Sequence, residues 1–194
     1  MIRIDELLKA YSQGFFPMSD PQDEKVYWCR PYKRAVFNLG TYRASRDVQR
    51  LKRKNEFSIT FDKEFEGVIK GCAAPRKSDP ATWISDEIIE AYIKLHRLGF
   101  AHSIESWYQG ELVGGLYGIA LGAAFFGESM FSRRSYASRM AFDRLVAHLN
   151  ERGYLLLDAQ IMNPHLSKLG AVEIDHEEYL RQLRRALQKK IVFL

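Results

Sequence analysis

The sequence has few of the cysteine and histidine residues that cross-link small domains through disulfide bonds or metal ions. It has only two cysteines, Cys29 and Cys72, and its five histidines lie far apart. Two isolated thiols exclude a disulfide framework, and without clustered Cys and His residues the sequence predicts no zinc site. We therefore expect two reduced cysteines that serve as packing residues, no metal ion and no cofactor.

Long apolar runs are also missing. No segment approaches the roughly 20 consecutive apolar residues that a membrane helix requires. The start, Met1-Ile2-Arg3-Ile4-Asp5-Glu6, lacks the apolar block of a secretory signal. We expect a cytoplasmic protein with no membrane partner, acting as a monomer.

The composition is that of an ordinary folded domain. The chain has 194 residues, of which 46% are hydrophobic and 27% are charged, enough for one main core and a smaller appended lobe. The formal net charge of +5 is locally concentrated, because basic residues crowd positions 43–54. Ser45 is a plausible N-cap of a helix that places Arg46, Arg50 and Arg53 on one face. This face is either simply solvated or attracts a phosphate backbone.

The apolar periodicity divides the chain into short helices and strands. Val26 to Phe37 alternates unevenly, which favours one edge-like strand. Ser85 can cap a helix that runs to Leu98, with an acidic first turn and Gly99 at its end. From residue 102 the period changes to that of strands, and the sequence predicts, in order, an antiparallel meander over 102–127, a helix over about 136–152, a buried strand from 154, a short helix over 163–170 and a last strand over 171–174.

This order resembles the acetyltransferase-like (GNAT) fold, an α/β (α+β) fold with a mixed, mostly antiparallel sheet flanked by helices. We expect a small N-terminal lobe over residues 1–60, which includes the basic helix, and a GNAT-like catalytic domain over residues 61–194. Acetyl-CoA enzymes of that fold place a glycine-rich pyrophosphate cradle after the fourth strand. The equivalent loop here, Glu128 to Arg134, has no glycine-rich nest.

Three polar residues stand out in apolar strands. Asp158 and Gln160 should project from the same face of their strand, because side chains alternate with period two. Glu128 is predicted to end its strand at the mouth of a loop. A carboxylate in so apolar a strand needs a partner, so each acid is either paired structurally, for example with an arginine, or part of a functional site.

The chain resembles leucyl/phenylalanyl-tRNA–protein transferases from Tyr11 to about Tyr179. The matching blocks are Ala10-Tyr11, Gly14-Phe15-Phe16-Pro17, Arg34-Ala35-Val36, Phe65-Glu66, Val68-Ile69, Gly71-Cys72-Ala73, Thr82-Trp83-Ile84, Glu90-Ala91-Tyr92, His102-Ser103-Ile104-Glu105, Leu112 to Gly118, Phe125 to Ser132, Ala137-Ser138, Asp158-Ala159-Gln160 and Leu169-Gly170-Ala171. Two departures are that Met18 replaces an aromatic residue and that Trp28 lies in the context Trp28-Cys29-Arg30-Pro31, with one apparent insertion.

The resemblance implies transfer of Leu, Phe or Met from its tRNA to the N-terminal Arg or Lys of acceptor proteins, which marks them for N-end-rule degradation. The partners would be Leu-tRNA or Phe-tRNA and those acceptor proteins. The matching site residues are the catalytic Asp158, Gln160 and Glu128, an aminoacyl pocket that includes Leu116, Phe125 and Met130, and Trp28 and Trp83 for adenosine stacking. Leu145 stands where an aromatic pocket residue can occur, and we count it in the pocket. The local positive charge makes Arg46, Arg50, Arg53, Lys54, Arg76 and Lys77 the expected contacts to the tRNA backbone.

The residue chemistry suits those roles. Indole stacking contributes about 1–3 kcal/mol per base, and a flexible Met adapts to an apolar guest. An amide such as Gln160 is not a base, so we expect it to orient the attacking amine, with Asp158 orienting Gln160 and favouring the developing ammonium, and Glu128 binding the basic acceptor residue. The alternatives are an acyl-CoA-dependent N-acetyltransferase on the same fold and a non-catalytic RNA-binding module.

Overall fold

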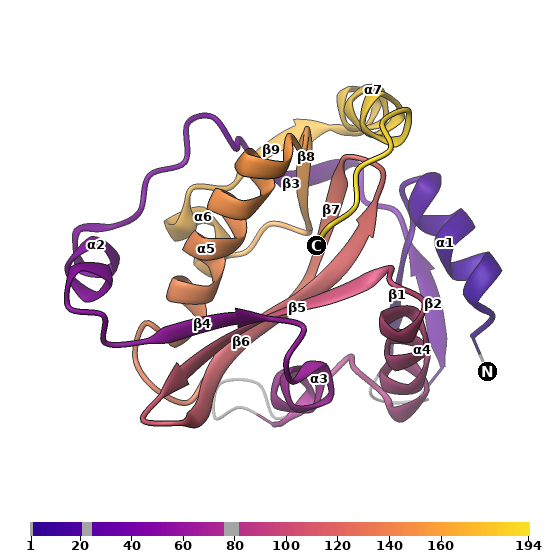
Figure 1. Ribbon diagram of the computed structural model, residues 1–194. Coiled ribbons are helices and arrows are strands. Elements are labelled where there is room, and N and C mark those ends of the chain that lie inside the picture. Colours follow the sequence, from indigo (N-terminus) through magenta and orange to yellow (C-terminus); the bar gives the residue numbers. More distant parts are fainter. Residues whose placement is uncertain (1, 21–24, 76–81) are drawn as a thin grey trace.

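The computed structural model describes residues 2–20, 25–75 and 82–194 (Figure 1). Its centre is a seven-stranded sheet with the order β4-β5-β6-β7-β8-β3-β9, and a separate two-stranded ribbon pairs β1 with β2. The strands are β1 (Phe16–Ser19), β2 (Val26–Cys29), β3 (Lys33–Phe37), β4 (Ser58–Phe61), β5 (Ala101–Tyr108), β6 (Glu111–Leu121), β7 (Ala124–Ser132), β8 (Leu156–Gln160) and β9 (Val172–Asp175).

The large sheet is antiparallel except for one pair. Strands β7 and β8 are parallel, and helix α5 (Ala137–Arg152) makes the crossover between them. The predicted mixed, mostly antiparallel sheet flanked by helices is therefore confirmed. Gly153, in the left-handed region with φ of 78°, ends α5 where the sequence placed its end.

Helices cover both faces of the sheet and define two buried clusters. One cluster packs the sheet against α1 (Ile4–Ser12), α3 (Phe65–Ala73), α4 (Asp86–Arg97) and α7 (His176–Leu187). The other packs the opposite face against α5, α6 (Pro164–Leu169) and Phe193, one residue before the C-terminus. The sheet face covered by the first cluster is the α1 face, and the face covered by the second cluster is the α5 face.

The basic helix lies apart from both clusters' centres. α2 (Arg46–Arg53) begins after Ser45, whose side chain accepts from the Val48 amide, as predicted. Val48 and Leu51 pack against α5, at the opposite side of the molecule from α1 (Figure 1). The basic residues of α2 therefore face outward.

The strand prediction for residues 26–37 is wrong. Two strands form there, and β3 is not at an edge but pairs with β8 on one side and β9 on the other. Strands β3 and β4 both belong to the large sheet, and its two edge strands, β4 and β9, come from opposite halves of the chain. The division into residues 1–60 and 61–194 stays a prediction.

A β-bulge interrupts β7 where the polar residues begin. Tyr117 of β6 pairs with Ser129, whereas the next residue, Gly118, pairs with Gly127, so Glu128 is the extra residue. Gly118 is required here, because a Cβ atom would lie 2.2 Å from the Phe126 carbonyl oxygen. The ladder between β7 and β8 also stops at this level, at Phe126 and Asp158, although β7 continues to Ser132 and β8 to Gln160.

Candidate active site

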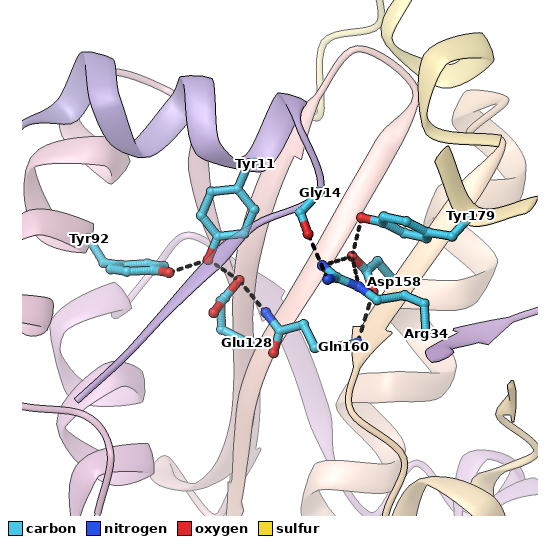
Figure 2. Close-up of polar contacts among 8 residues, drawn as sticks. All are labelled: Tyr11, Gly14, Arg34, Tyr92, Glu128, Asp158, Gln160 and Tyr179. Carbon is cyan, nitrogen blue, oxygen red and sulfur yellow. Dashed lines mark hydrogen bonds and ion pairs between the residues drawn. The ribbon is translucent and has the colours of Figure 1, made fainter. Parts of the chain in front are cut away.

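Glu128 is the centre of a buried hydrogen-bonded cluster on the α1 face. Tyr11 of α1 donates to its Oε1 at 2.6 Å, and Gln160 of β8 donates its side-chain amide to the same oxygen at 2.9 Å (Figure 2). The Tyr11 hydroxyl also hydrogen-bonds the hydroxyl of Tyr92 in α4. Glu128 thus joins β7 to β8 at the level where their backbone pairing ends.

Glu128 does not lie at a loop mouth, so that prediction is wrong. Its strand runs four residues further, to Ser132, and the side chain is only 8% exposed. The bulge explains the difference, since it lets a polar residue turn inward without ending the strand. The Oε2 atom is buried and has no hydrogen-bond partner among the described residues. A buried, unpartnered carboxylate oxygen is costly unless something binds to it.

Burial changes the ionisation of this carboxyl group. Removal from water raises the pKa of Glu128 to about 7, although hydrogen bonds from Tyr11 and Gln160 act in the opposite direction. The group therefore exchanges its proton near neutral pH, as a group that handles a cationic amine can do.

Asp158 lies beside this cluster in a fully buried ion pair. Arg34 of β3 holds it through Nε at 2.9 Å and Nη2 at 2.7 Å, and Tyr179 of α7 donates to Oδ2 at 2.7 Å. The fourth donor is the backbone amide of Gln160, 2.8 Å from Oδ1. The structural pairing with an arginine is therefore present, and Asp158 also contacts Gln160.

Gln160 has the backbone geometry of a constrained site residue. It ends β8 with a φ of 63°, a left-handed value that is uncommon outside glycine. The register between β3 and β8 shifts at the same place. Asp158 and Gln160 both turn to the α1 face, as the period-two alternation predicts, and there Gln160 reaches Glu128.

The four proposed aminoacyl-pocket residues come together on the other face of the sheet. Leu116, Phe125 and Leu145 are buried in the cluster beneath α5, and the partly exposed Met130 packs against it. Met130 lies opposite Leu116 in the β6–β7 pairing, and its sulfur is 3.2 Å from Nε2 of His165 in α6. The bulge at Glu128 shifts the alternation, so Glu128 and Met130 turn to opposite faces at the level where β7 and β8 separate.

The two tryptophans have different surroundings. Trp28 is 44% exposed and lines a surface hollow of about 350 Å³ with residues of α1. It pairs with Pro17, while the neighbouring Phe16 packs its ring over Arg34, so Trp28 lies on the ribbon face away from the Asp158 network. Trp83 is partly buried against the α1-face cluster, and its carbonyl accepts from the Ser19 amide.

The basic residues are separate from the Glu128 cluster. Arg46, Arg50, Arg53 and Lys54 are exposed on or just after α2, and Arg50 forms an ion pair with Asp47 at 3.0 Å. Arg76 and Lys77 lie outside the described residues. In the part of the chain that the structure describes, no group of three or more His, Cys, Asp or Glu side chains could hold a metal ion, and no helix is long and apolar enough to cross a membrane.

The loop after β7 does not form a phosphate cradle. The amides of Arg133 and Arg134 both point to the Val113 carbonyl, at 2.7 and 3.3 Å, and the Ser138 amide is bonded by the Ser132 side chain. These N–H groups are therefore not free to surround a pyrophosphate as they would in an acetyl-CoA site. The loop geometry disfavours an acyl-CoA-dependent enzyme.

Comparison with known proteins agrees with the matched sequence blocks. The family model described as "Leucyl/phenylalanyl-tRNA protein transferase" matches residues 36–184, and the model of its N-terminal domain matches residues 1–31. The chain belongs to this family.

Relatives of the same name match over the whole length. Leucyl/phenylalanyl-tRNA–protein transferases from Pelodictyon phaeoclathratiforme and Chlorobium phaeobacteroides are 81% and 69% identical over 100% of both chains. Among solved structures, L-PGS from Bacillus licheniformis gives a TM-score of 0.49 at 13% identity, over 96% of this chain and 71% of its own. The chain is therefore an aminoacyltransferase that takes Leu or Phe from aminoacyl-tRNA.

Several residues around the transferase site were not singled out from the sequence. Arg34 and Tyr11 occur only within the matching blocks, Tyr92 occurs there and on the apolar stripe of its helix, and Tyr179 lies in a C-terminal helix that was not predicted. A usable signal existed for that helix, because Tyr179, Leu183 and Ala186 recur at helical spacing and are all buried. No local pattern, however, pairs Arg34 with an aspartate 124 residues away.

The raised pKa of Glu128 predicts a pH-dependent stability for the transferase. The folded state holds this proton more tightly than the unfolded chain, so the stabilising contribution is complete below about pH 4.5 and is lost as the pH rises to about 7. Across that range the wild-type protein should lose about 3 kcal/mol of unfolding free energy relative to Glu128→Gln, whose amide does not titrate. Urea unfolding of both proteins at several pH values measures this, and parallel pH curves would contradict it.

Proposed function

We propose that the enzyme joins Leu, Phe or Met from its aminoacyl-tRNA to the N-terminal Arg or Lys of acceptor proteins. The observation that carries the proposal is the Glu128–Gln160 contact at the separation of β7 and β8. Where the two strands separate, Glu128 and Gln160 lie on the α1 face. Met130 lies on the α5 face, packed against the cluster that contains Leu116, Phe125 and Leu145, which is called the Met130 cluster. An ester held between the two strands would have its apolar side chain on one side and the incoming amine on the other.

The reaction needs orientation more than a strong base. The α-amine has a reference pKa of about 7.7–8, so on the order of a tenth of it is neutral near pH 7. It attacks the ester carbonyl carbon, a C–N bond forms, and the bond to the 3′-terminal ribose oxygen breaks. The amine loses a proton and the ribose oxygen gains one, so the net reaction requires no other reactant. Positioning and electrostatic stabilisation supply the acceleration.

Each polar residue then has a distinct role. Because its side-chain N–H is already given to Glu128, Gln160 has its amide oxygen left to accept from the attacking amine. Glu128, with its unpartnered Oε2, is proposed to receive the basic acceptor terminus. The four acceptor positions of Asp158 are all occupied by protein donors, so we assign it to the orientation of Gln160 and not to direct contact with the ammonium.

The remaining proposed contacts hold the aminoacyl-tRNA. Leu116, Phe125 and Leu145 form the back of the aminoacyl pocket, and Met130, the partly exposed member, adjusts to the guest. Trp83 and Trp28 are proposed to stack on bases, with the smaller contribution from Trp28 because of the ribbon face on which it lies. Arg46, Arg50, Arg53, Lys54, Arg76 and Lys77 are proposed to contact the tRNA backbone.

The proposal uses residues of one chain and places the reaction in the cytoplasm, where aminoacyl-tRNA is available. Mass spectrometry tests it directly. Leu-tRNA and the enzyme should add one leucyl residue to peptides that begin with Arg or Lys, and not to peptides that begin with Asp, Ala or citrulline. Citrulline is the sharpest control, since it keeps the shape of Arg without the charge. Equal labelling of the citrulline peptide would remove the acidic acceptor site, and no labelling of any peptide would overturn the proposed function.

A further inference from the structure

Arg34 is a fully enclosed charged side chain beside the site. It is 0% exposed, and its guanidinium lies between the rings of Phe16 and Tyr179, 4.7 and 4.5 Å from their centroids. Besides binding Asp158, it donates through Nη1 to the Gly14 carbonyl at 2.9 Å. One side chain therefore connects the segment after α1, the interior strand β3, α7 and β8 (Figure 2).

Asp158 links Arg34 to Gln160. Its Oδ2 accepts from Arg34 and from the Tyr179 hydroxyl, which fixes the plane of the carboxylate. Its Oδ1 accepts from Arg34 and from the backbone amide of Gln160. A carboxylate with all four positions filled cannot rotate without breaking at least one charge-assisted bond.

The fixed carboxylate determines where Gln160 points. The bond from its backbone amide holds the residue at a φ of 63°, a conformation that persists only when surrounding contacts impose it. That conformation directs the side chain across the end of the β7–β8 ladder to Glu128 Oε1. If the Arg34–Asp158 pair served only to stabilise the fold, Asp158 would have no need to bind the backbone amide of Gln160, the one residue of β8 with a left-handed φ.

We propose that Arg34 and Tyr179 are positioning residues of the transfer reaction, which act through Asp158 to hold Gln160 in its reactive orientation. Neither residue touches the reacting atoms. The inference rests on the proposed role of Gln160 in orienting the acceptor amine. It extends that role to a helix, α7, that contributes no other residue to the proposed site.

Tyr179→Phe tests the inference with the least disturbance. It deletes the hydroxyl that binds Asp158 and keeps the ring over Arg34. We expect kcat for leucyl transfer to an Arg peptide to fall about tenfold, with unchanged KM values for peptide and Leu-tRNA, since misorientation costs the chemical step and not binding. The matched control is Tyr154→Phe, which deletes another buried hydroxyl, one without a partner among the described residues. That control should keep the wild-type kcat.

A spectroscopic readout separates positioning from loss of structure. In the NMR spectrum, the side-chain amide signals of Gln160, assigned by their loss in Gln160→Glu, should shift or broaden in Tyr179→Phe and not in Tyr154→Phe. Arg34→Lys should cause a larger fall in kcat than Tyr179→Phe, because it removes the two-pronged contact with Asp158.

The outcomes are distinct. If the wild-type enzyme transfers leucine but Tyr179→Phe keeps both its kcat and its Gln160 signals, the positioning role is wrong and the proposed function stands. If the Gln160 signals move while kcat does not, Gln160 orientation is irrelevant to catalysis and the inference also fails. If the wild-type enzyme transfers nothing to the Arg peptide, the proposed function itself has failed.

Discussion

Asp158→Ala should lower the free energy of unfolding by about 3–5 kcal/mol, the cost of leaving a buried charge without its partner. Arg34 and Asp158 are both 0% exposed, so removal of the carboxylate leaves the guanidinium charge buried without its counter-ion. Urea unfolding at pH 7 measures the change. The control is Glu178→Ala, which removes the exposed ion pair with Arg181 and should leave the free energy of unfolding close to that of the wild type.

An equal, small loss in both variants would contradict this account of the site. It would mean that Arg34 finds another partner or reaches solvent when Asp158 is removed. Asp158→Asn should fall between the two, since an amide can still accept from Arg34 and Tyr179 through its single oxygen but no longer neutralises the guanidinium.

Gln160→Glu should reduce the single-turnover rate of leucyl transfer about 100-fold, the scale of loss expected when a reacting group is misplaced by about 1 Å. The new carboxylate cannot donate to Glu128 Oε1, and two acids in contact repel each other or share a proton. Rapid-quench measurement with saturating Arg peptide and Leu-tRNA isolates the chemical step. Gln188→Glu, at an exposed position after α7, should leave the rate unchanged.

An unchanged rate in Gln160→Glu would show that the amide does not orient the amine. Because the change is isosteric, a fall in rate accompanied by a wild-type unfolding curve can be assigned to chemistry. A fall accompanied by a large loss of stability would instead trace to repulsion within the buried cluster. Lowering the pH below 7, where Glu128 holds its proton, should then recover part of the lost unfolding free energy.

Local sequence patterns were enough to predict the helix ends and the strand that surround the site. Ser45 and Ser85 begin their helices with side-chain caps, and Gly153 ends α5, because these positions depend on near neighbours in the chain. Alternation alone placed Asp158 and Gln160 on a common face. The family resemblance then selected Glu128 from among the other acids.

The parts that could not be predicted depend on distant contacts. The bulge at Glu128 is visible only once β6 is paired with β7, and it reverses which face Met130 occupies. The partners Arg34 and Tyr179 come from segments far from Asp158 in the sequence. The prediction of one strand over 26–37 was wrong because Pro31 separates a ribbon strand, β2, from an interior strand of the large sheet, β3.

The central claim is that the ester lies between β7 and β8, with Glu128 and Gln160 on one side of it and Met130 on the other. A crystal structure with a stable analogue, leucine joined through an amide to 3′-amino-3′-deoxyadenosine, tests this most directly. The account predicts the analogue's carbonyl group beside Gln160, its amide NH within hydrogen-bond reach of the Gln160–Glu128 pair, and its leucyl side chain against Met130, Leu116 and Phe125. An analogue bound only in the hollow beside Trp28, with the Met130 cluster closed, would contradict it.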